Sequence, residues 1–409
     1  MQRLYTAAQV RELDRIVIEK FGISGYELMQ RAGSFTYSVL NKYFPRAFYI
    51  YVFCGRGNNA GDGYVLAKLA IEDDKYDRKV IVVNCFNPEK LEGDAKTVYQ
   101  DLVTMKYDKN KVEIRDGSTF RKEEYMDLNL GELGSVFVDA IFGTGLTRDI
   151  NDENLVHTIQ FINFNTMEDE KQGALSIDIP SGLNADTGSV MGVAVNSDVT
   201  ATFMGQKRGM FTHDGREYSG QIEFDDLDIP HESYNELEGS HCNLLDFDYF
   251  LPKREQNAHK GHFGHVLIIG GDEGMAGAPL LAATAALRIG AGKVTVVMNA
   301  NQSIQRPCPL EIMVYGVSHG ADLTAFIKQA SVCVLGPGLG MATWGRNLFK
   351  QVLASQIPMI VDASALRILA DLPQFDDNWI LTPHAGEAAA LLRCSTDWVN
   401  SNRYTAINQ

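Results

Sequence analysis

The sequence contains little of what zinc-binding, disulfide-rich, secreted or membrane proteins need. It has six cysteines in 409 residues and no Cys-x-x-Cys pair, so neither a zinc-binding framework nor a disulfide framework is expected. Several of these cysteines lie in or beside apolar runs, and we interpret them as reduced core residues of a cytoplasmic protein. No segment reaches the roughly 18 consecutive apolar residues of a membrane-spanning helix. Residues 1–6 contain no apolar signal core.

Positive charge is also scarce. The chain has 37 Lys and Arg residues against 52 Asp and Glu residues, which gives a formal net charge of −15. Nucleic acids and anionic membranes attract surfaces that are rich in Lys and Arg, so we expect neither as a partner. The length suffices for two or three domains, each with its own apolar core.

Two series of strand-like runs divide the chain. Short apolar runs alternate with helix-length segments between residues 48 and 203, and again between residues 264 and 381. This alternation predicts an α/β fold in which parallel sheets are covered by helices on both faces. Residues 226–252 are acidic and polar. We therefore predict two three-layer α/β/α domains, over residues 1–230 and residues 253–409. Residues 231–252 are predicted to form the linker between them.

Local signals predict two helices before the first strand. Residues 6–9 form a capping box that opens the first helix, and Gly22 ends it. Residues 24–27 form a second box, and the second helix is predicted to stop at Gly33. The glycine-rich residues 55–63 are predicted to form a turn between a strand and a helix.

Polar side chains follow three strands of the first domain. A glycine-rich segment follows the first strand, Asp139 and a Gly-Thr-Gly turn end another, and Asp178 ends a third, with Ser181 after a proline. Each feature alone is also typical of an ordinary turn or a helix cap. Ligands of open parallel sheets bind at the carboxyl ends of the strands, so three such ends together indicate a binding site. Glycines and a following helix N-terminus favour a phosphate there.

The same residues offer a set of oxygen ligands. Asn59, Asp139 and Ser181 carry an amide, a carboxylate and a hydroxyl, which suit a hard cation rather than zinc. The sequence has no carboxylate cluster of the kind that divalent ions prefer. A monovalent cation is therefore the better hypothesis.

The first half of the chain, residues 1–230, resembles the YjeF N-terminal family, whose members are NAD(P)HX epimerases with a Rossmann-like fold. The resemblance rests on five motifs in the same order, at residues 28–33, 58–63, 139–145, 177–182 and 205–209. This family interconverts the R and S forms of hydrated NADH and NADPH. The resemblance implies that hydrated NADH or NADPH is the partner of this chain and that potassium is held by Asn59, Asp139 and Ser181.

The resemblance also implies which residues bind the dinucleotide. They are Asn58, Asn59, Ala60, Gly61, Asp62, Gly143, Thr144, Gly145, Leu146, Thr147, Arg148 and Asp149, and Asp178 would contact the hydrated nicotinamide ring. Epimerisation can proceed by loss of hydroxide from the carbon beside the ring nitrogen and re-addition of water on the other face. A strand-end carboxylate can stabilise the iminium-like cation and move the proton, so Asp178 is our candidate catalytic residue. Lys207 is a second candidate, although it could equally be a solvated loop lysine beside Arg208.

The second half resembles the YjeF C-terminal family, the ADP- or ATP-dependent NAD(P)HX dehydratases with a ribokinase-like fold. The matching motifs are residues 260–265, 270–272, 277–279, 336–340 and 381–387. The resemblance implies that Ala278, Gly340 and His384 contact the hydrated dinucleotide and that ADP or ATP with Mg²⁺ is the cofactor. The structural alternatives are packing for Ala278, a tight turn for Gly340 and a core imidazole for His384.

Two departures from that family affect the expected activity. Ser364 stands where the family has an acidic residue, and no Gly-(Thr/Ser)-Gly-Asp loop follows His384. We therefore expect a C-terminally truncated, incomplete ribokinase-like domain with impaired dehydratase activity. The alternatives are a working bifunctional enzyme completed by another chain, and a non-catalytic nucleotide-binding or scaffold protein. A dinucleotide-dependent dehydrogenase is disfavoured because no G-x-G-x-x-G fingerprint follows the first strand. The sequence decides neither between NADHX and NADPHX nor whether the chain forms a homo-oligomer.

Overall fold

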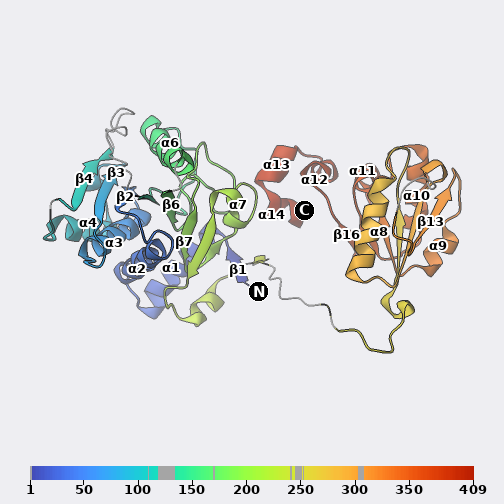
Figure 1. Ribbon diagram of the computed structural model, residues 1–409, viewed down its shortest axis with the longest axis horizontal. Coiled ribbons are helices and arrows are strands. Elements are labelled where there is room, and N and C mark those ends of the chain that lie inside the picture. Colours follow the sequence, from blue (N-terminus) through green and yellow to red (C-terminus); the bar gives the residue numbers. More distant parts are fainter. Residues whose placement is uncertain are drawn as a thin grey trace. The chain divides into compact units, whose positions relative to one another are not determined.

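The chain divides into two compact units in a computed structural model, Met1–Asp248 and Tyr249–Gln409 (Figure 1). The structure describes residues 2–108, 110–117, 134–168, 171–239, 242–244, 251, 253–302 and 308–409. Among these residues, no helix is both long and apolar enough to cross a membrane. Each unit is built around its own sheet.

The first unit contains a seven-stranded sheet in the order β4-β3-β2-β5-β6-β7-β9. All of its described pairings are parallel, which confirms the predicted α/β class. The strands are β2 (Tyr49–Cys54), β3 (Lys79–Asn84), β4 (Val112–Asp116), β5 (Ser135–Ala140), β6 (Gln172–Ile177), β7 (Val199–Phe203) and β9 (Gln221–Asp225).

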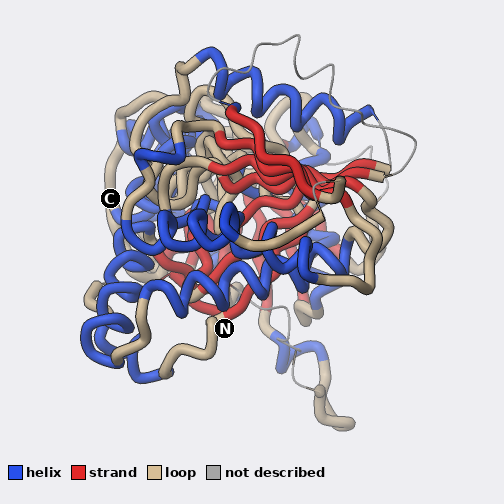
Figure 2. Tube along the Cα trace, turned by 90° about the vertical axis from the view of Figure 1, so that its left-hand side faces the viewer, coloured by secondary structure: helices blue, strands red, loops and turns tan. Residues whose placement is uncertain are grey.

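Helices cover both faces of this sheet (Figures 1 and 2). Successive side chains of a strand point to opposite faces. On β2, Val52 therefore belongs to an apolar cluster with residues of α1 to α4, whereas Tyr51 and Phe53 belong to a cluster with Ile159 of α6. The helices are α1 (Ala7–Phe21), α2 (Gly25–Tyr43), α3 (Asn58–Glu72), α4 (Gly93–Thr104), α6 (Glu153–Glu168) and the short α7 (Gly215–Tyr218).

The predicted capping box of the first helix is confirmed. The second box forms only in part, because only its Ser24 side chain caps the helix, and the predicted end of the second helix is wrong. Thr6 and Gln9 form the capping box of α1, Gly22 ends that helix at φ 74°, and Ser24 caps α2. Helix α2 continues through Gly33 to Tyr43. A Cβ at position 33 would lie 2.5 Å from Val65 Cγ1 of α3. Gly33 is therefore a site of close helix packing and not a helix stop.

The glycine-rich turn is shorter than predicted, because α3 already begins at Asn58. Only residues 55–57 connect β2 to the helix. A Cβ at Gly63 would lie 2.7 Å from Ala140 Cβ of β5, and one at Gly61 would lie 2.6 Å from Met29 Cε of α2. Because glycine has no side chain, α3 packs closely against the sheet on one side and against α2 on the other. The first turn of α3 lies at the end of β2.

The first unit also contains a small sheet of three strands. This sheet includes part of the segment that was predicted to be a linker, so that prediction is wrong for this part. Strand β1 (Gln2–Tyr5) pairs with β8 (Gln206–Lys207) in parallel and with β10 (Cys242–Leu244) in antiparallel fashion. The 3₁₀ helix η4 (His231–Glu236) contacts α1. The first part of the predicted linker, residues 231–252, thus folds onto this unit. Positions 240–241, 245–250 and 252 lie outside the described residues.

The second unit contains a six-stranded parallel sheet in the order β13-β12-β11-β14-β15-β16. One of its faces packs mainly with α10 and α11, and the other packs with α8. Its strands are β11 (His265–Ile269), β12 (Lys293–Asn299), β13 (Ile312–Val317), β14 (Val332–Leu335), β15 (Met359–Val361) and β16 (Trp379–Leu381). Its α-helices are α8 (Gly277–Ile289), α9 (Thr324–Gln329), α10 (Thr343–Leu353), α11 (Ser364–Asp371), α12 (Ala385–Leu392), α13 (Thr396–Ser401) and α14 (Arg403–Asn408). Short 3₁₀ turns complete the described residues of the two units: η1 (Pro88–Lys90), η3 (Arg208–Phe211), η5 (Lys260–Phe263) and η6 (Ala300–Gln302).

The packing at Gly33 leads to a stability prediction. We expect Gly33→Ala to lower the free energy of unfolding of the first unit by about 1–3 kcal/mol, because the new methyl group overpacks the contact between α2 and α3. Urea denaturation measures this change. The matched control is Ser34→Ala, an exposed position of the same helix, which should change stability by less than about 0.5 kcal/mol. Equal effects of the two substitutions would contradict the close-packing explanation.

Candidate active site

A cavity of about 970 Å³ opens at the carboxyl ends of β2, β5 and β6. Most of the residues that the sequence analysis assigned to a dinucleotide line it: Asn58, Asn59, Asp62, Gly143, Thr144, Gly145, Leu146, Thr147, Arg148 and Asp149. Ala60 and Gly61 do not line the cavity. They are buried in α3, where Gly61 packs against Met29.

Asp178 stands at the end of β6 in a strained backbone conformation. Its φ is 67°, which is uncommon for a residue other than glycine. Ile179 N donates to Ile177 O at 2.8 Å, so the chain makes a γ-turn about Asp178, and the form with positive φ is rare. A Cβ at Gly143 would lie 3.2 Å from Asp178 Oδ2. The carboxylate therefore lies beside the Gly-Thr-Gly segment at the cavity wall. Such backbone strain is typical of functional sites.

Lys207 is the ion-pair partner of Asp178. Its side chain is fully buried, and its ammonium group contacts Asp178 Oδ1. The ammonium also donates to Thr202 Oγ1 at 2.9 Å and to Phe203 O at 3.3 Å. A buried ammonium requires such partners, because its desolvation is costly. The interpretation of Lys207 as a solvated loop lysine is therefore wrong.

Asp139 and Ser181 form a compact hydrogen-bonded pair beside this site. The Asp139 carboxylate is fully buried and accepts from Ser181 Oγ at 2.5 Å and from Ser181 N at 2.7 Å. It also accepts from Ser176 Oγ at 2.8 Å and from Ile141 N at 3.2 Å. Burial raises the pKa of Asp139, and the hydrogen bonds from Ser181 and Ser176 oppose that rise. Asp139 thus anchors the loops that follow β5 and β6.

The Asn59 side chain is the unsatisfied group of the site. It is 7% exposed, and both its amide oxygen and its amide nitrogen lack a hydrogen-bond partner among the described residues. A Cβ built at Gly143 would lie 3.6 Å from the Asn59 Cβ. A buried amide without partners is rare unless an ion or water completes it. One amide, one hydroxyl and one carboxylate offer oxygen ligands with a single negative charge, which fits a monovalent cation. Asp139 already accepts four hydrogen bonds, so direct coordination would replace one of them.

Asp62 of α3 is a buried carboxyl group on the cavity wall, 9% exposed. Burial raises its pKa well above the ordinary value for aspartate, and the negative charges of Asp178 and Asp14 raise it further, whereas Lys207 lowers it. Burial and the neighbouring carboxylates also raise the pKa of Asp14. The carboxyl groups of Asp62, Asp14 and Asp178 thus lie close enough to repel one another when charged, and Lys207 offsets this repulsion only in part. Burial and this repulsion favour the neutral form of Asp62.

Several cavity residues were not identified from the sequence. Arg11 of α1 donates to Thr144 O at 3.0 Å and thereby ties α1 to the Gly-Thr-Gly segment. Arg56 lies 5.8 Å from the centre of the Phe86 ring, and both residues line the cavity. Phe86 follows β3, so the rule that ligands bind at strand ends could have found it. No sequence signal marks Arg11, which lies on a helix remote in sequence.

In the second unit, two of the three predicted site residues lie around one loop. A Cβ at Gly340 would lie 2.8 Å from Asp272 Oδ2, and one at Gly338 would lie 3.4 Å from Ala278 Cβ. Gly340 has φ 74°, as a tight turn requires. Asp272 N donates to Gly338 O at 2.7 Å, so the loops after β11 and β14 are joined.

His384 does not join this pair through any contact in the described part of the chain. It stands at the end of β16 and caps α12, where its Nδ1 accepts from Gly386 N at 3.0 Å. Its side chain is exposed, so the interpretation as a core imidazole is wrong. The residue beside Ser364, Ala363, has φ 49° and precedes α11. The position of Ser364 is thus at a strained strand-to-helix turn.

The raised pKa of Asp62 leads to a prediction about pH and stability. Because the folded state favours the protonated group, the stability of the wild type should fall as pH rises from the unfolded pKa, about 3.9, toward the folded value. Asp62→Asn removes this titration, so the stability of the variant relative to wild type should increase as pH rises above the unfolded pKa, about 3.9. Urea denaturation at several pH values measures it. The control is Asp77→Asn, an exposed position, and a pH-independent difference for Asp62→Asn would contradict the assignment.

Comparison with known families matches both halves of the chain. Residues 25–209 match the family described as YjeF-related protein N-terminus, and residues 266–409 match the family described as NAD(P)H-hydrate dehydratase. Among solved structures, an ADP/ATP-dependent NAD(P)H-hydrate dehydratase from Bacillus subtilis, co-crystallised with ATP and Mg²⁺, is 28% identical. It covers 37% of this chain, this chain covers 56% of it, and the TM-score is 0.33.

Curated relatives match nearly the whole chain. The bifunctional NAD(P)H-hydrate repair enzyme Nnr of Coxiella burnetii is 39% identical over 413 residues, which are 100% of this chain and 79% of the relative. The enzyme of the same name from Escherichia coli is 33% identical over 419 residues, 98% of this chain and 73% of the relative. Identity of this extent, over both units in the same order, goes beyond a shared fold. The chain belongs to the family of bifunctional NAD(P)H-hydrate repair enzymes.

Proposed function

We propose that the first unit epimerises the R and S forms of hydrated NADH and NADPH. The observation that carries this proposal is the Asp178–Lys207 ion pair on a strained turn at the wall of the cavity. The cavity volume of about 970 Å³ is ample for a dinucleotide. Asn58 lies in the first turn of α3, where the helix N-terminus favours a phosphate. The Gly143–Asp149 segment also lines the cavity.

In the proposed mechanism, Asp178 faces the hydrated nicotinamide ring. The bond between the ring carbon and its hydroxyl breaks, the hydroxide leaves with a proton from the site, and a cation remains on the ring. Water then adds to the other face and returns a proton. The Asp178 carboxylate stabilises the cation and carries the proton, and the buried Lys207 holds the carboxylate in place. Reactant and product differ only in configuration, so atoms and charge balance.

Potassium is the cation that we propose for the site of Asn59, Asp139 and Ser181. The unpaired Asn59 amide supports this assignment, and the bound ion would supply positive charge near the substrate phosphates or hydroxyls. The chain itself orients these groups: the γ-turn and the Ser181 hydrogen bonds hold the loop after β6 against Asp139.

For the second unit, we propose an ADP- or ATP-dependent dehydratase of the S form, which would regenerate NADH or NADPH. Ala278, Gly340 and His384 are the proposed contacts with the hydrated dinucleotide, and Mg²⁺ would accompany the nucleotide. The similarity to curated relatives does not support the expected impairment of this activity. A cytoplasmic location remains part of the proposal, and all six cysteines are free.

The principal experiment is a chiral assay of mixed R- and S-NADHX with potassium, with and without ADP and Mg²⁺. The wild type should interconvert the two forms, and Asp178→Asn should lower that rate by roughly 10²-fold or more, because the carboxylate stabilises the cation and carries the proton. Asp77→Asn is the matched control, an exposed aspartate of the same unit, and it should leave the rate unchanged.

The outcomes separate the proposals for the two units. Interconversion that survives in Asp178→Asn would overturn the catalytic assignment. Formation of NADH that requires ADP would support a working second unit, and its absence would support impairment. If neither reaction occurs in the wild type, the non-catalytic binding protein becomes the better hypothesis. A thermal shift by the hydrated dinucleotide would then identify binding.

The cation site has its own test, which does not depend on activity. K⁺ should raise the melting temperature of the wild type relative to Li⁺ at equal ionic strength, because a ligand that binds only the native state stabilises it. Asn59→Ala should abolish this difference. Asn58→Ala, the exposed neighbour on α3, should retain it. A K⁺ effect of the same size in Asn59→Ala would contradict the site.

A further inference from the structure

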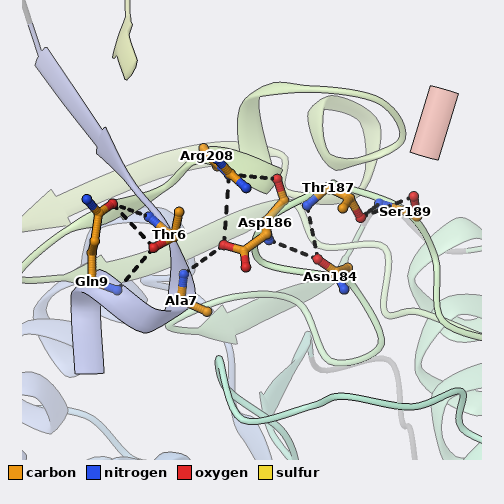
Figure 3. A network of polar contacts seen from close by, with 8 residues as sticks. All are labelled: Thr6, Ala7, Gln9, Asn184, Asp186, Thr187, Ser189 and Arg208. Carbon is orange, nitrogen blue, oxygen red and sulfur yellow. Dashed lines mark hydrogen bonds and ion pairs between the residues drawn. The ribbon is translucent and has the colours of Figure 1, made fainter. Parts of the chain in front are cut away.

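A network of polar contacts joins the start of α1 to the loop between β6 and β7 (Figure 3). Asp186 Oδ1 accepts a hydrogen bond from Ala7 N at 2.8 Å. Ala7 is the first residue of α1, where backbone N–H groups have no acceptor within the helix and where the helix dipole favours negative charge. The same oxygen lies 3.9 Å from Arg208 Nε, which also donates to Asp186 O at 3.1 Å. Asp186 therefore contacts both α1 and the residue that follows Lys207.

The backbone of Lys207 is held from two sides by the elements that Asp186 joins. On one side, β8 pairs with β1, so that Tyr5 lies opposite Lys207, and β1 leads directly into α1. On the other side, Gly209 N donates to Ala185 O at 2.7 Å. The positions of β1 and of the loop around residue 186 thus determine where the Lys207 ammonium group lies.

The loop between β6 and β7 is held by its own hydrogen bonds, and it begins at the γ-turn about Asp178. Asn184 Oδ1 accepts from Asp186 N at 2.9 Å and from Thr187 N at 3.0 Å. Asp178 lies in the same connection between β6 and β7. Asp186 does not line the cavity, so it has no direct contact with a substrate there. Any effect of Asp186 on the reaction must act through its neighbours.

We propose that Asp186 is a positioning residue of the epimerase site. It holds the N-terminus of α1 and the segment 206–209 against the loop between β6 and β7, and so sets the Lys207 ammonium against Asp178. This inference rests on the proposed epimerase function of the first unit. The contact with Arg208 is long and partly exposed, so it contributes little energy by itself. The hydrogen bond to the helix N-terminus supplies most of the constraint.

The test compares Asp186→Ala and Asp186→Asn with a matched control in the full chain. Ser24→Ala is the control, because Ser24 Oγ accepts from Glu27 N at 3.1 Å and so caps α2 without contacting Lys207. Asp186→Ala should lower the epimerase kcat about tenfold with KM within about twofold, because small displacements of a catalytic group are costly. Asp186→Asn should lose about threefold, since its amide oxygen still accepts from Ala7 N. Ser24→Ala should change kcat by less than about 1.5-fold.

Hydrogen exchange supplies a readout that does not depend on activity. Amides of the segment 204–210 should exchange faster in Asp186→Ala than in Ser24→Ala, because only the former releases β8. A kcat that falls equally in Asp186→Ala and Ser24→Ala, or a change in KM alone, would overturn the proposal. If Asp186→Ala does not fold, Asp186→Asn decides: a threefold loss of kcat supports the proposal, and a kcat equal to that of Ser24→Ala contradicts it.

The same assay separates this inference from the proposed function. An inactive wild type contradicts the epimerase function, and the inference then fails with it. An active wild type together with an unchanged Asp186→Ala contradicts the positioning role alone.

Discussion

The candidate site of the first unit depends on one ion pair, between the fully buried Lys207 and the partly exposed Asp178. An ammonium group without access to water is tolerated only with close partners, and loss of one partner from such a pair typically costs about 3–5 kcal/mol. The partners of Lys207 come from the γ-turn after β6 and from the end of β7. The strand that carries Lys207 is paired with the N-terminal strand β1. Segments distant in sequence thus meet at one charged contact on the cavity wall.

Glycine packing places the remaining wall of the cavity. Gly61 and Gly63 bring α3 against α2 and β5, and Gly33 allows α2 to approach α3. The first turn of α3 therefore lies at the end of β2, where the Asn59 side-chain amide, which has no hydrogen-bond partner among the described residues, lines the cavity. A bulkier residue at these positions would move the helix and with it the polar groups that the proposed chemistry uses.

The sequence was sufficient for the fold class, most strands and the residues that gather at the strand ends, because continuous apolar runs and Gly, Asn and Asp turns are local signals. The predictions were wrong where a glycine allows close helix packing instead of forming a turn, as at Gly33 and Gly61. The sequence also contains no indication that Lys207 is buried, because a lysine beside an arginine is usually solvated. Contacts such as Arg11 with Thr144 join residues far apart in the chain, and no local pattern encodes them. The short strands β1, β8 and β10 owe their pairing to tertiary contacts.

In the proposed mechanism, chemistry at Asp178 exchanges the hydroxyl group of the substrate with water. Epimerisation of one NADHX isomer in H₂¹⁸O, followed by mass spectrometry of the product, tests it most directly. The new isomer should carry one ¹⁸O atom, and it should form at the enzymatic rate only in the wild type and not in Asp178→Asn. Enzymatic formation of an isomer that retains its original oxygen would contradict loss of hydroxide and re-addition of water.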